Sequence, residues 1–316
     1  MKTLQPATDP RAWDAATAGP PAAWYFPLSD ACLAALEPAL RELRDPGRAV
    51  TDLAVTDEQR AACHDCLEPV RAALETGRGF AILDRIPLER YPPREATALY
   101  WLIGQLLGQP FEQNVQGTLL YDVRDTGQDV RYGARFSVTN AESTFHTDNS
   151  FGDTVLDYVG LLVLRTAKSG GLSQLVSGHA VCRELEERRP DVLEVLSRPF
   201  HVERRGGVKD GQAPTARFPV VARHRGDVRF RYLRYWIETG HERAGEPLTA
   251  EQVEALDVLD GVLSERRLRV EFALRPGEAL FVNNRWLLHN RTGFEDHTEP
   301  ELRRHLVRLW LQAPAD

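Results

Sequence analysis

The chain has 316 residues, of which 42% are hydrophobic and 27% charged, and its formal net charge at pH 7 is −7. This composition is ordinary for a globular protein, and the length suits one large domain or two smaller ones. The acidic balance argues against a nucleic-acid partner, which usually requires a basic stripe, and does not favour an anionic membrane surface. No apolar run approaches the roughly 20 residues of a membrane span, and the N-terminus lacks the apolar core of a secretory signal, so we expect a cytoplasmic protein.

The four cysteines also favour a cytoplasmic location. They are Cys32, Cys63, Cys66 and Cys182. A chain of this length does not need disulfide bonds, and this cysteine count suits a reducing cytosol. The Cys-x-x-Cys pair at Cys63 and Cys66 looks like half a zinc site, but no second pair lies at a typical spacing. Because the surrounding stretch has helical periodicity, we interpret both cysteines as helix residues without a metal.

The first third of the chain is expected to be mostly helical. An irregular arm rich in Pro and Ala precedes a predicted helix over residues 30–43. Further helices are predicted over residues 57–77 and 94–107, each followed or closed by glycine. A short apolar run at residues 79–83 is typical of a core strand.

From about residue 115 the pattern changes to short strands separated by Gly, Asp and Asn. Strands are predicted over residues 119–123, 157–166, 173–176, 228–237, 269–274, 279–283 and 305–312. Helices are predicted over residues 182–197 and 249–264, the second with Thr249 as its N-cap. The polar segment 204–219 contains glycine and is a candidate lid.

Many strands, with helices at one end of the chain, predict a mainly β protein of the α+β class. The expected architecture is a β-barrel or jelly roll that carries helical supports. We expect residues 1–78 to form an N-terminal arm and helical support, and residues 79–316 to form the core, in one continuous domain.

The first candidate metal ligands are His146 and Asp148, which immediately precede a run predicted to be buried β-structure. Residues two apart on an extended backbone point to the same side of the chain, so both side chains can reach one ion. The His-x-acid pattern is a weak signal, because it recurs at His201 and His297. Those two lie beside an Arg-rich loop and in an acidic turn, whereas only His146 and Asp148 adjoin a long apolar strand.

One imidazole and one carboxylate leave a divalent metal under-coordinated, and His289 is the candidate third ligand. It follows a predicted turn and the core strand 279–283, and a histidine at the end of such a strand points into the mouth of a barrel, where ligands bind. His146, Asp148 and His289 would form a facial triad with three open positions. That arrangement is typical of non-heme iron(II) that binds a chelating cosubstrate and dioxygen.

The last predicted strand carries two arginines. Arg304, Leu306, Arg308 and Trp310 share one face, and His305 takes the other. Two arginines on an otherwise apolar face are unfavourable unless they meet anions, and a guanidinium binds a carboxylate through two parallel hydrogen bonds. Because the alternation turns His305 away from Arg304, His305 is not a candidate ligand.

Together these residues resemble the TauD/TfdA (taurine dioxygenase, clavaminate synthase-like) family of Fe(II)/2-oxoglutarate-dependent oxygenases. The resemblance covers roughly residues 79–312 and is carried by His146-Thr147-Asp148, Gly170-Gly171-Leu172-Ser173, Pro276 to Asn284, His289-Asn290-Arg291-Thr292 and Arg304-x-x-x-Arg308. It implies a double-stranded β-helix, which is a cupin-like jelly roll flanked by helices, and the use of Fe(II), 2-oxoglutarate and O2. The γ-butyrobetaine hydroxylase branch is also similar, but these cysteines do not supply its N-terminal zinc module, so its substrate is not carried over.

The resemblance also implies roles for individual residues. His146, Asp148 and His289 look like the iron ligands, and Arg304 looks like the partner of the distal carboxylate of 2-oxoglutarate. Ser173 stands where the family often has a threonine that hydrogen-bonds this cosubstrate, and Arg308 matches a position that touches cosubstrate or an anionic substrate. The candidate substrate contacts are Asn149, Arg135, Gln116 and Tyr232.

The implied reaction is hydroxylation of an unactivated C–H bond in a small, anionic or amino-acid-like metabolite, with release of succinate and CO2. The carboxylate at Asp148 favours hydroxylation over halogenation, whereas desaturation and cyclisation remain open. The alternative class is a non-catalytic or zinc-loaded β-barrel that binds a metabolite as a sensor or scaffold. Retention of all three ligands together with Arg304 favours the enzyme. We expect a small-molecule substrate and no nucleic-acid or membrane partner, and a homo-oligomer remains open.

Overall fold

The computed structural model describes the chain except residues 1–8, 129–135, 205–207, 209–210, 225 and 315–316. Within the described residues, seven strands form the main sheet. Its order is β1 (Tyr25–Pro27), β2 (Phe80–Asp84), β13 (Ala279–Asn283), β5 (Tyr158–Arg165), β16 (His305–Gln312) and β3 (Gln109–Phe111), with β4 (Leu120–Val123) also paired to β16. β1 and β2 run parallel and the other neighbours antiparallel. The central β5 is almost continuously apolar, which suits a strand that is covered on both faces.

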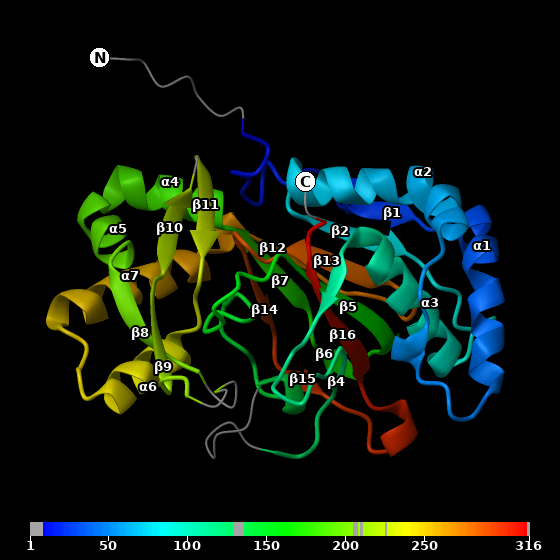
Figure 1. Cartoon of the computed structure of the whole chain (residues 1–316). Helices are drawn as coiled ribbons and strands as arrows, with labels where there is room; N and C mark the ends of the chain where they lie inside the picture. The colour runs from blue at the N-terminus through cyan, green and yellow to red at the C-terminus, as the bar shows by residue number, and fades with distance from the viewer. Residues whose placement is uncertain (1–8, 129–135, 205–207, 209–210, 225, 315–316) are drawn as a thin grey trace.

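A second, antiparallel sheet contains β12 (Arg269–Phe272), β7 (Ser173–Ser177) and β14 (Leu287–Arg291). Side chains of both sheets belong to one buried cluster: Val159, Leu280 and Val282 come from the main sheet, and Leu175 and Leu287 from the second. The two sheets therefore face each other across a shared apolar layer (Figure 1).

Three helices cover the outer face of the main sheet: α1 (Asp30–Leu40), α2 (Asp57–Glu75) and α3 (Pro93–Leu107). α3 packs so closely on β16 that a Cβ at Gly104 would overlap the side chain of Leu309. A disulfide between Cys32 and Cys63 joins α1 to α2, with their Cα atoms 4.7 Å apart. This pairing contradicts our expectation that the cysteines need no disulfide, and it removes the support that cysteine use gave to a reducing compartment.

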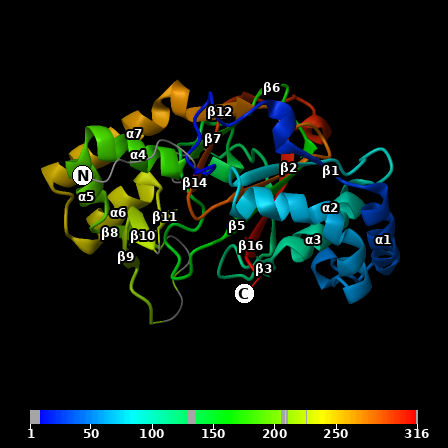
Figure 2. The ribbon, with the colours of Figure 1, turned by 90° about the horizontal axis from the view of Figure 1, so that it is seen from above.

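A second group of helices lies at the opposite end of the molecule, as both ribbon views show (Figures 1 and 2). It consists of α4 (Gly178–Arg188), α5 (Pro190–Leu196), α6 (Arg234–Ala244) and α7 (Ala250–Ser264), which share an apolar cluster with the strand pairs β8 (Pro199–Glu203)–β9 (Thr215–Pro219) and β10 (Val221–His224)–β11 (Asp227–Phe230). Of these helices, α4, α5 and α7 lie where helices were predicted, and α6 was not predicted. The mixture of helices and mainly antiparallel sheets is confirmed.

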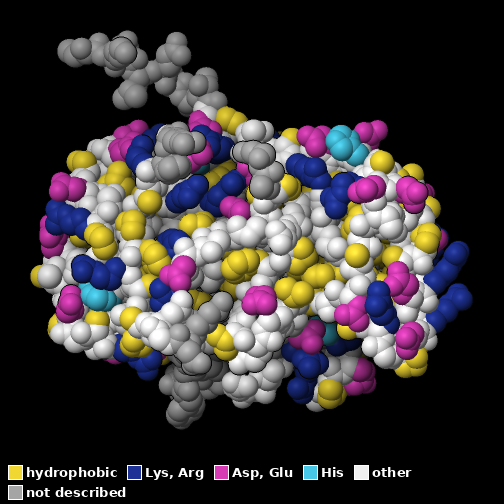
Figure 3. All heavy atoms as spheres, in the orientation of Figure 1, with side chains coloured by type: hydrophobic (Ala, Val, Ile, Leu, Met, Phe, Trp, Pro, Cys, Tyr) yellow, Lys and Arg dark blue, Asp and Glu magenta, His cyan; other side chains and the backbone are white. Residues whose placement is uncertain are grey.

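The remaining short elements complete the described chain. β6 (Ser169–Gly170) pairs with β15 (Phe294–Glu295). Short 3-10 helices span Pro21–Trp24, Arg41–Arg44, Val50–Asp52, Phe136–Val138, Arg266–Leu268 and Pro300–Leu302. Within the described residues, no helix combines the length and apolar character that crossing a bilayer demands. On the face shown in Figure 3, acidic and basic side chains are intermixed.

Three predicted elements differ from the structure. The helix expected over residues 182–197 is divided before Pro190, because the proline ring disfavours a helical conformation for Arg189, whose φ is −147° and ψ 62°. The strand expected over residues 228–237 ends at Phe230 and gives way to α6. The candidate lid 204–219 contains β9, which pairs with β8.

Candidate active site

The backbone of His146 is fixed directly to the strand that carries His289. His146 and His289 form an isolated antiparallel bridge, with N–O distances of 3.0 and 2.9 Å. His289 lies within β14, a strand of its own, and not at the end of the preceding core strand as we had expected. The main chain of Asp148 is held by Asn284: its N–H donates to Asn284 Oδ1 (2.7 Å), and its carbonyl accepts from Asn284 Nδ2 (2.9 Å).

Thr147, between the two candidate ligands, fixes this segment to the backbone of Tyr232, just before α6. Its N–H donates to the carbonyl of Tyr232 (2.9 Å), and its hydroxyl accepts from the N–H of Tyr232 (3.1 Å). The Tyr232 ring is fully buried and its hydroxyl donates to Asp260. Tyr232 therefore supports the segment through its backbone and does not line the cavity.

The three candidate ligands converge. His146 Nε2 lies 3.5 Å and His289 Nε2 3.8 Å from the same oxygen, Asp148 Oδ1. All three ligand atoms lie within 4.8 Å of one another, and this is the one such group of His, Cys, Asp and Glu in the part of the chain that the structure describes. Two imidazoles and one carboxylate are the donor set of a facial triad, so these residues fit a non-heme iron(II) ion.

The protonation states also suit metal binding. His146 Nδ1 lies 2.7 Å from the carbonyl of Thr144, and because a carbonyl only accepts, Nδ1 is the donor in this contact and Nε2 is the nitrogen that faces the other two candidate ligands. Burial, together with the neighbouring His146, lowers the pKa of His289 to about 3, so this imidazole is neutral at pH 7. Burial raises the pKa of Asp148, but the charge of Arg308 and the hydrogen bond to His146 outweigh it and hold that pKa below its usual range.

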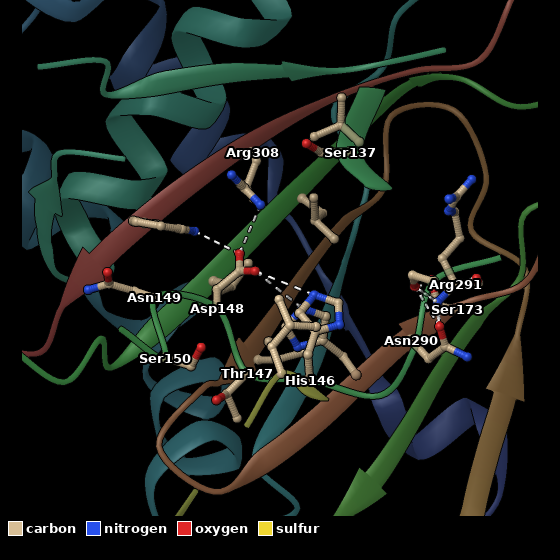
Figure 4. A pocket seen from close by; sticks show the side chains of 18 of the residues that line it. Ser137, His146, Thr147, Asp148, Asn149, Ser150, Ser173, Asn290, Arg291 and Arg308 are labelled. Atoms are coloured by element: carbon tan, nitrogen blue, oxygen red, sulfur yellow. Dashed lines mark hydrogen bonds and ion pairs between the residues drawn. The ribbon is translucent and has the colours of Figure 1, made fainter. Parts of the chain in front are cut away.

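These residues lie in a cavity of about 240 Å³ between the two sheets (Figure 4). Its walls are mostly apolar, with a few polar groups directed inward. The lining residues include Gln113, Ser143, Asn149, Phe151, Val159, Leu161, Ser173, Leu175, Tyr235, Trp236, Arg291, Arg304, Leu306, Arg308 and Trp310. Alternate residues of β16 face this cavity, as the sequence predicted, and His305 points to the other side, where its Nε2 lies 2.7 Å from Asp122.

Arg304 is buried in the cavity wall, with 8% of its surface exposed. Its guanidinium carbon lies 5.1 Å from the centre of the Phe294 ring, and no carboxylate in the described residues lies within ion-pair distance of it. Burial, and then the charge of Arg291, lower the pKa of Arg304 to about 9. A buried cation without an anion is unfavourable, so this arrangement fits a bound carboxylate.

The other predicted site residues occupy different places. Ser173, the first residue of β7, lines the same cavity, and so does Asn149, whose positive φ of 54° is unusual for a residue other than glycine. Gln116 is exposed on a turn and does not line the cavity, and Arg135 lies outside the described residues. Arg308 lines the cavity, but its guanidinium contacts Asp148 and Gln113.

Several lining residues were not chosen as site residues from the sequence. Tyr235 and Trp236 reach the cavity from α6, where we had expected a strand. Gln113 lies in an irregular segment whose sequence carries no signal of its burial. Trp310 shares a strand face with Arg308, and that alternation could have identified it.

Comparisons with known proteins agree with this geometry. Residues 47–310 match the family described as "Taurine catabolism dioxygenase TauD, TfdA family". FR-33289 synthase of Streptomyces rubellomurinus is 26% identical over 316 residues, which cover 97% of this chain and 90% of the relative. Uridine-5'-phosphate dioxygenase of an Amycolatopsis species is 30% identical over 289 residues, which cover 86% of this chain and 96% of the relative.

Solved structures show the same fold. Asparagine oxygenase in complex with Fe(II), 2S,3S-3-hydroxyasparagine and succinate superposes with a TM-score of 0.67 at 21% identity, covering 92% of this chain and 93% of that one. The non-heme iron oxygenase OrfP with Fe and alpha-ketoglutaric acid gives 0.65 at 18% identity, covering 92% and 94%. The chain belongs to the TauD/TfdA family and is a non-heme iron, 2-oxoglutarate-dependent dioxygenase.

Proposed function

We propose that this enzyme hydroxylates an unactivated C–H bond of a small, anionic or amino-acid-like metabolite and releases succinate and CO2. His146, Asp148 and His289 hold the iron, which supplies the activation of dioxygen coupled to decarboxylation of 2-oxoglutarate. The observation that carries the proposal is the approach of both imidazole Nε2 atoms to Asp148 Oδ1, at 3.5 and 3.8 Å, at the wall of a mostly apolar cavity.

Arg304 binds the distal carboxylate of 2-oxoglutarate, and the Ser173 hydroxyl contributes a hydrogen bond to it. The support is that Arg304 is a buried cation without a carboxylate partner in the described residues, and that both side chains line the cavity of the triad. The mostly apolar wall excludes water from the reacting centre and orients the substrate. Asn149 is the substrate contact that we retain from the sequence, whereas Gln116 and Tyr232 are set aside because neither lines the cavity.

The substrate class follows from charge and size. The lining residues include three arginines, and their one carboxylate is the candidate metal ligand Asp148. Because Arg308 contacts that carboxylate and Arg304 is assigned to 2-oxoglutarate, Arg291 is the lining cation that favours an anionic group on the substrate. One relative is named for uridine-5'-phosphate, and two structural neighbours were solved with 2S,3S-3-hydroxyasparagine or (3S)-hydroxy-L-Arg. A compound of comparable size suits a cavity of about 240 Å³.

We also propose that the two facing sheets are the halves of a double-stranded β-helix, with residues 79–316 as the oxygenase core and residues 1–78 as its helical support. The antiparallel strands and the shared apolar layer support this arrangement. A cytoplasmic location stays a prediction, and the disulfide between Cys32 and Cys63 does not favour it.

The experiment that tests the function uses the apoprotein under anaerobic conditions. Addition of Fe(II) and 2-oxoglutarate should produce a weak visible charge-transfer band at one equivalent of each, and admission of air should release succinate. A metabolite-binding barrel without catalysis predicts neither signal. Absence of both from a folded, metal-loaded protein would overturn the proposal.

A further inference from the structure

We propose that Arg308 and Trp310 are positioning residues for the metal-binding carboxylate: their N–H donors hold one oxygen of Asp148 and leave the other to bind the ion. This inference rests on the proposed metal site and deepens it. It also replaces our expectation that Arg308 contacts the cosubstrate or an anionic substrate.

The two oxygens of Asp148 have different surroundings. Oδ2 accepts a hydrogen bond from Arg308 Nη1 at 3.1 Å and another from Trp310 Nε1 at 2.8 Å. Oδ1 is the oxygen that faces both imidazoles. Figure 4 shows this division, with Arg308 on one side of the Asp148 carboxylate and His146 on the other. A carboxylate can bind a metal through one or both oxygens, and donors on Oδ2 favour binding through Oδ1 alone.

Both donors lie on β16, a strand held within the main sheet. Arg308 and Trp310 are two residues apart on β16 and therefore point to the same face. β16 is paired along its length with β5, where Arg308 lies opposite Leu161 and Trp310 opposite Val159. Trp310 is 4% exposed, so its indole N–H is shielded from water as it donates to the carboxylate. A donor that is fixed by a sheet holds its acceptor more accurately than one on a loop.

Arg308 is itself held in place by Gln113. Its Nε donates to Gln113 Oε1 at 2.8 Å, and Gln113 Nε2 donates back to the Arg308 carbonyl at 2.9 Å. The guanidinium carbon also lies 5.2 Å from the ring centre of Tyr121 and 5.0 Å from that of Trp310. These contacts orient Arg308 toward Asp148 without any ligand. An anion from cosubstrate or substrate would have to compete with Asp148 for this side chain.

Gln113 therefore orients Arg308, and Arg308 in turn holds Asp148. Trp310 is a second donor to the same carboxylate oxygen and does not depend on Gln113. Loss of either donor frees Oδ2 to rotate or to bind the ion as well. Binding through both oxygens would occupy a position that the cosubstrate or dioxygen requires. Removal of such supporting contacts typically lowers metal affinity by about 10- to 100-fold.

The test compares two Trp→Phe variants that lose the same kind of hydrogen bond. Trp310→Phe keeps the aromatic bulk and removes the donor to Asp148. Trp24→Phe is the matched control, because Trp24 Nε1 donates to the carbonyl of Ala18 at 2.9 Å in a buried place that does not line the cavity. Arg308→Gln serves as a second variant should Trp310→Phe fold poorly, since it retains a polar side chain and removes the charge.

The readouts are the dissociation constant of Co(II) from calorimetry and the visible d–d spectrum of the Co(II)-loaded protein, which reports coordination number. We expect about 10-fold weaker binding and an altered spectrum for Trp310→Phe and for Arg308→Gln, with wild-type values for Trp24→Phe. Equal affinities and spectra for Trp310→Phe, Arg308→Gln and Trp24→Phe would overturn the inference and leave the proposed function intact. Failure of the wild type to bind one equivalent of Co(II) would overturn both.

Discussion

Replacement of Arg304 by methionine should have opposite effects on cosubstrate binding and on the stability of the apoprotein. Burial lowers the pKa of Arg304 from 12.5 to about 9, and this difference corresponds to on the order of 5 kcal/mol for keeping the guanidinium charged inside the protein. That unfavourable energy is present in the apoprotein at neutral pH, because the side chain remains protonated there. Arg304→Met removes it, so the apo variant should be at least as stable as the wild type.

The same substitution should weaken 2-oxoglutarate binding severely. Truncation of one member of a buried, hydrogen-bonded charge pair costs about 2–5 kcal/mol, which corresponds to a roughly 30- to 5,000-fold rise in Kd. Anaerobic calorimetry of 2-oxoglutarate with the Mn(II)-loaded protein measures the binding, and urea unfolding measures the stability. The matched control is Arg303→Met, because Arg303 is the adjacent arginine, is exposed and contacts the carbonyl of His297.

The reasoning would be refuted if Arg304→Met bound 2-oxoglutarate within about threefold of the wild type. It would also fail if apo Arg304→Met were several kcal/mol less stable than Arg303→Met, since that result would show that Arg304 has a stabilising partner in the apoprotein.

Three further predictions concern other parts of the chain. His289→Ala should abolish stoichiometric metal binding in elemental analysis, whereas His305→Ala, on the opposite side of β16, should retain it. Cys32→Ser opens a covalent loop of 31 residues and should lower the free energy of unfolding by about 4 kcal/mol in urea titrations. Cys66→Ser is the control and should change the free energy of unfolding little. Similar losses in the two variants would argue against the disulfide. Burial, and then the charge of Arg11, lower the pKa of His179 from 6.5 to about 4. As the pH falls, His179 is therefore protonated in the unfolded chain before it is protonated in the folded protein, and the free energy of unfolding should decrease between pH 6.5 and 4. His179→Phe should show a shallower fall in thermal melts over that pH range, and a profile equal to that of the wild type would contradict the assignment.

The parts of the site that were predictable are those governed by local alternation. The spacing of His146 and Asp148, and the shared face of Arg304, Arg308 and Trp310, follow from the period of an extended chain. These patterns identify side chains that point in the same direction, and the structure brings them to one cavity.

The parts that were missed depend on contacts between distant segments. Arg308 donates to Asp148, which lies 160 residues earlier in the chain, and no local sequence pattern predicts that contact. The pairing of Cys32 with Cys63 requires the packing of α1 on α2, and cysteine spacing alone does not determine connectivity. The segment that contains Tyr235 was misread because the alternation that begins at Val228 was taken to continue to Ile237, whereas the strand ends at Phe230 and α6 begins at Arg234.

The central claim is that two imidazoles and one carboxylate oxygen bind a single ion beside a buried guanidinium. Anomalous diffraction from crystals grown with Mn(II) and 2-oxoglutarate tests it most directly. The account predicts one anomalous peak within bonding distance of His146 Nε2, His289 Nε2 and Asp148 Oδ1, with the cosubstrate's distal carboxylate on Arg304. A peak at any other group of residues, or a cosubstrate whose distal carboxylate lies away from Arg304, would contradict it.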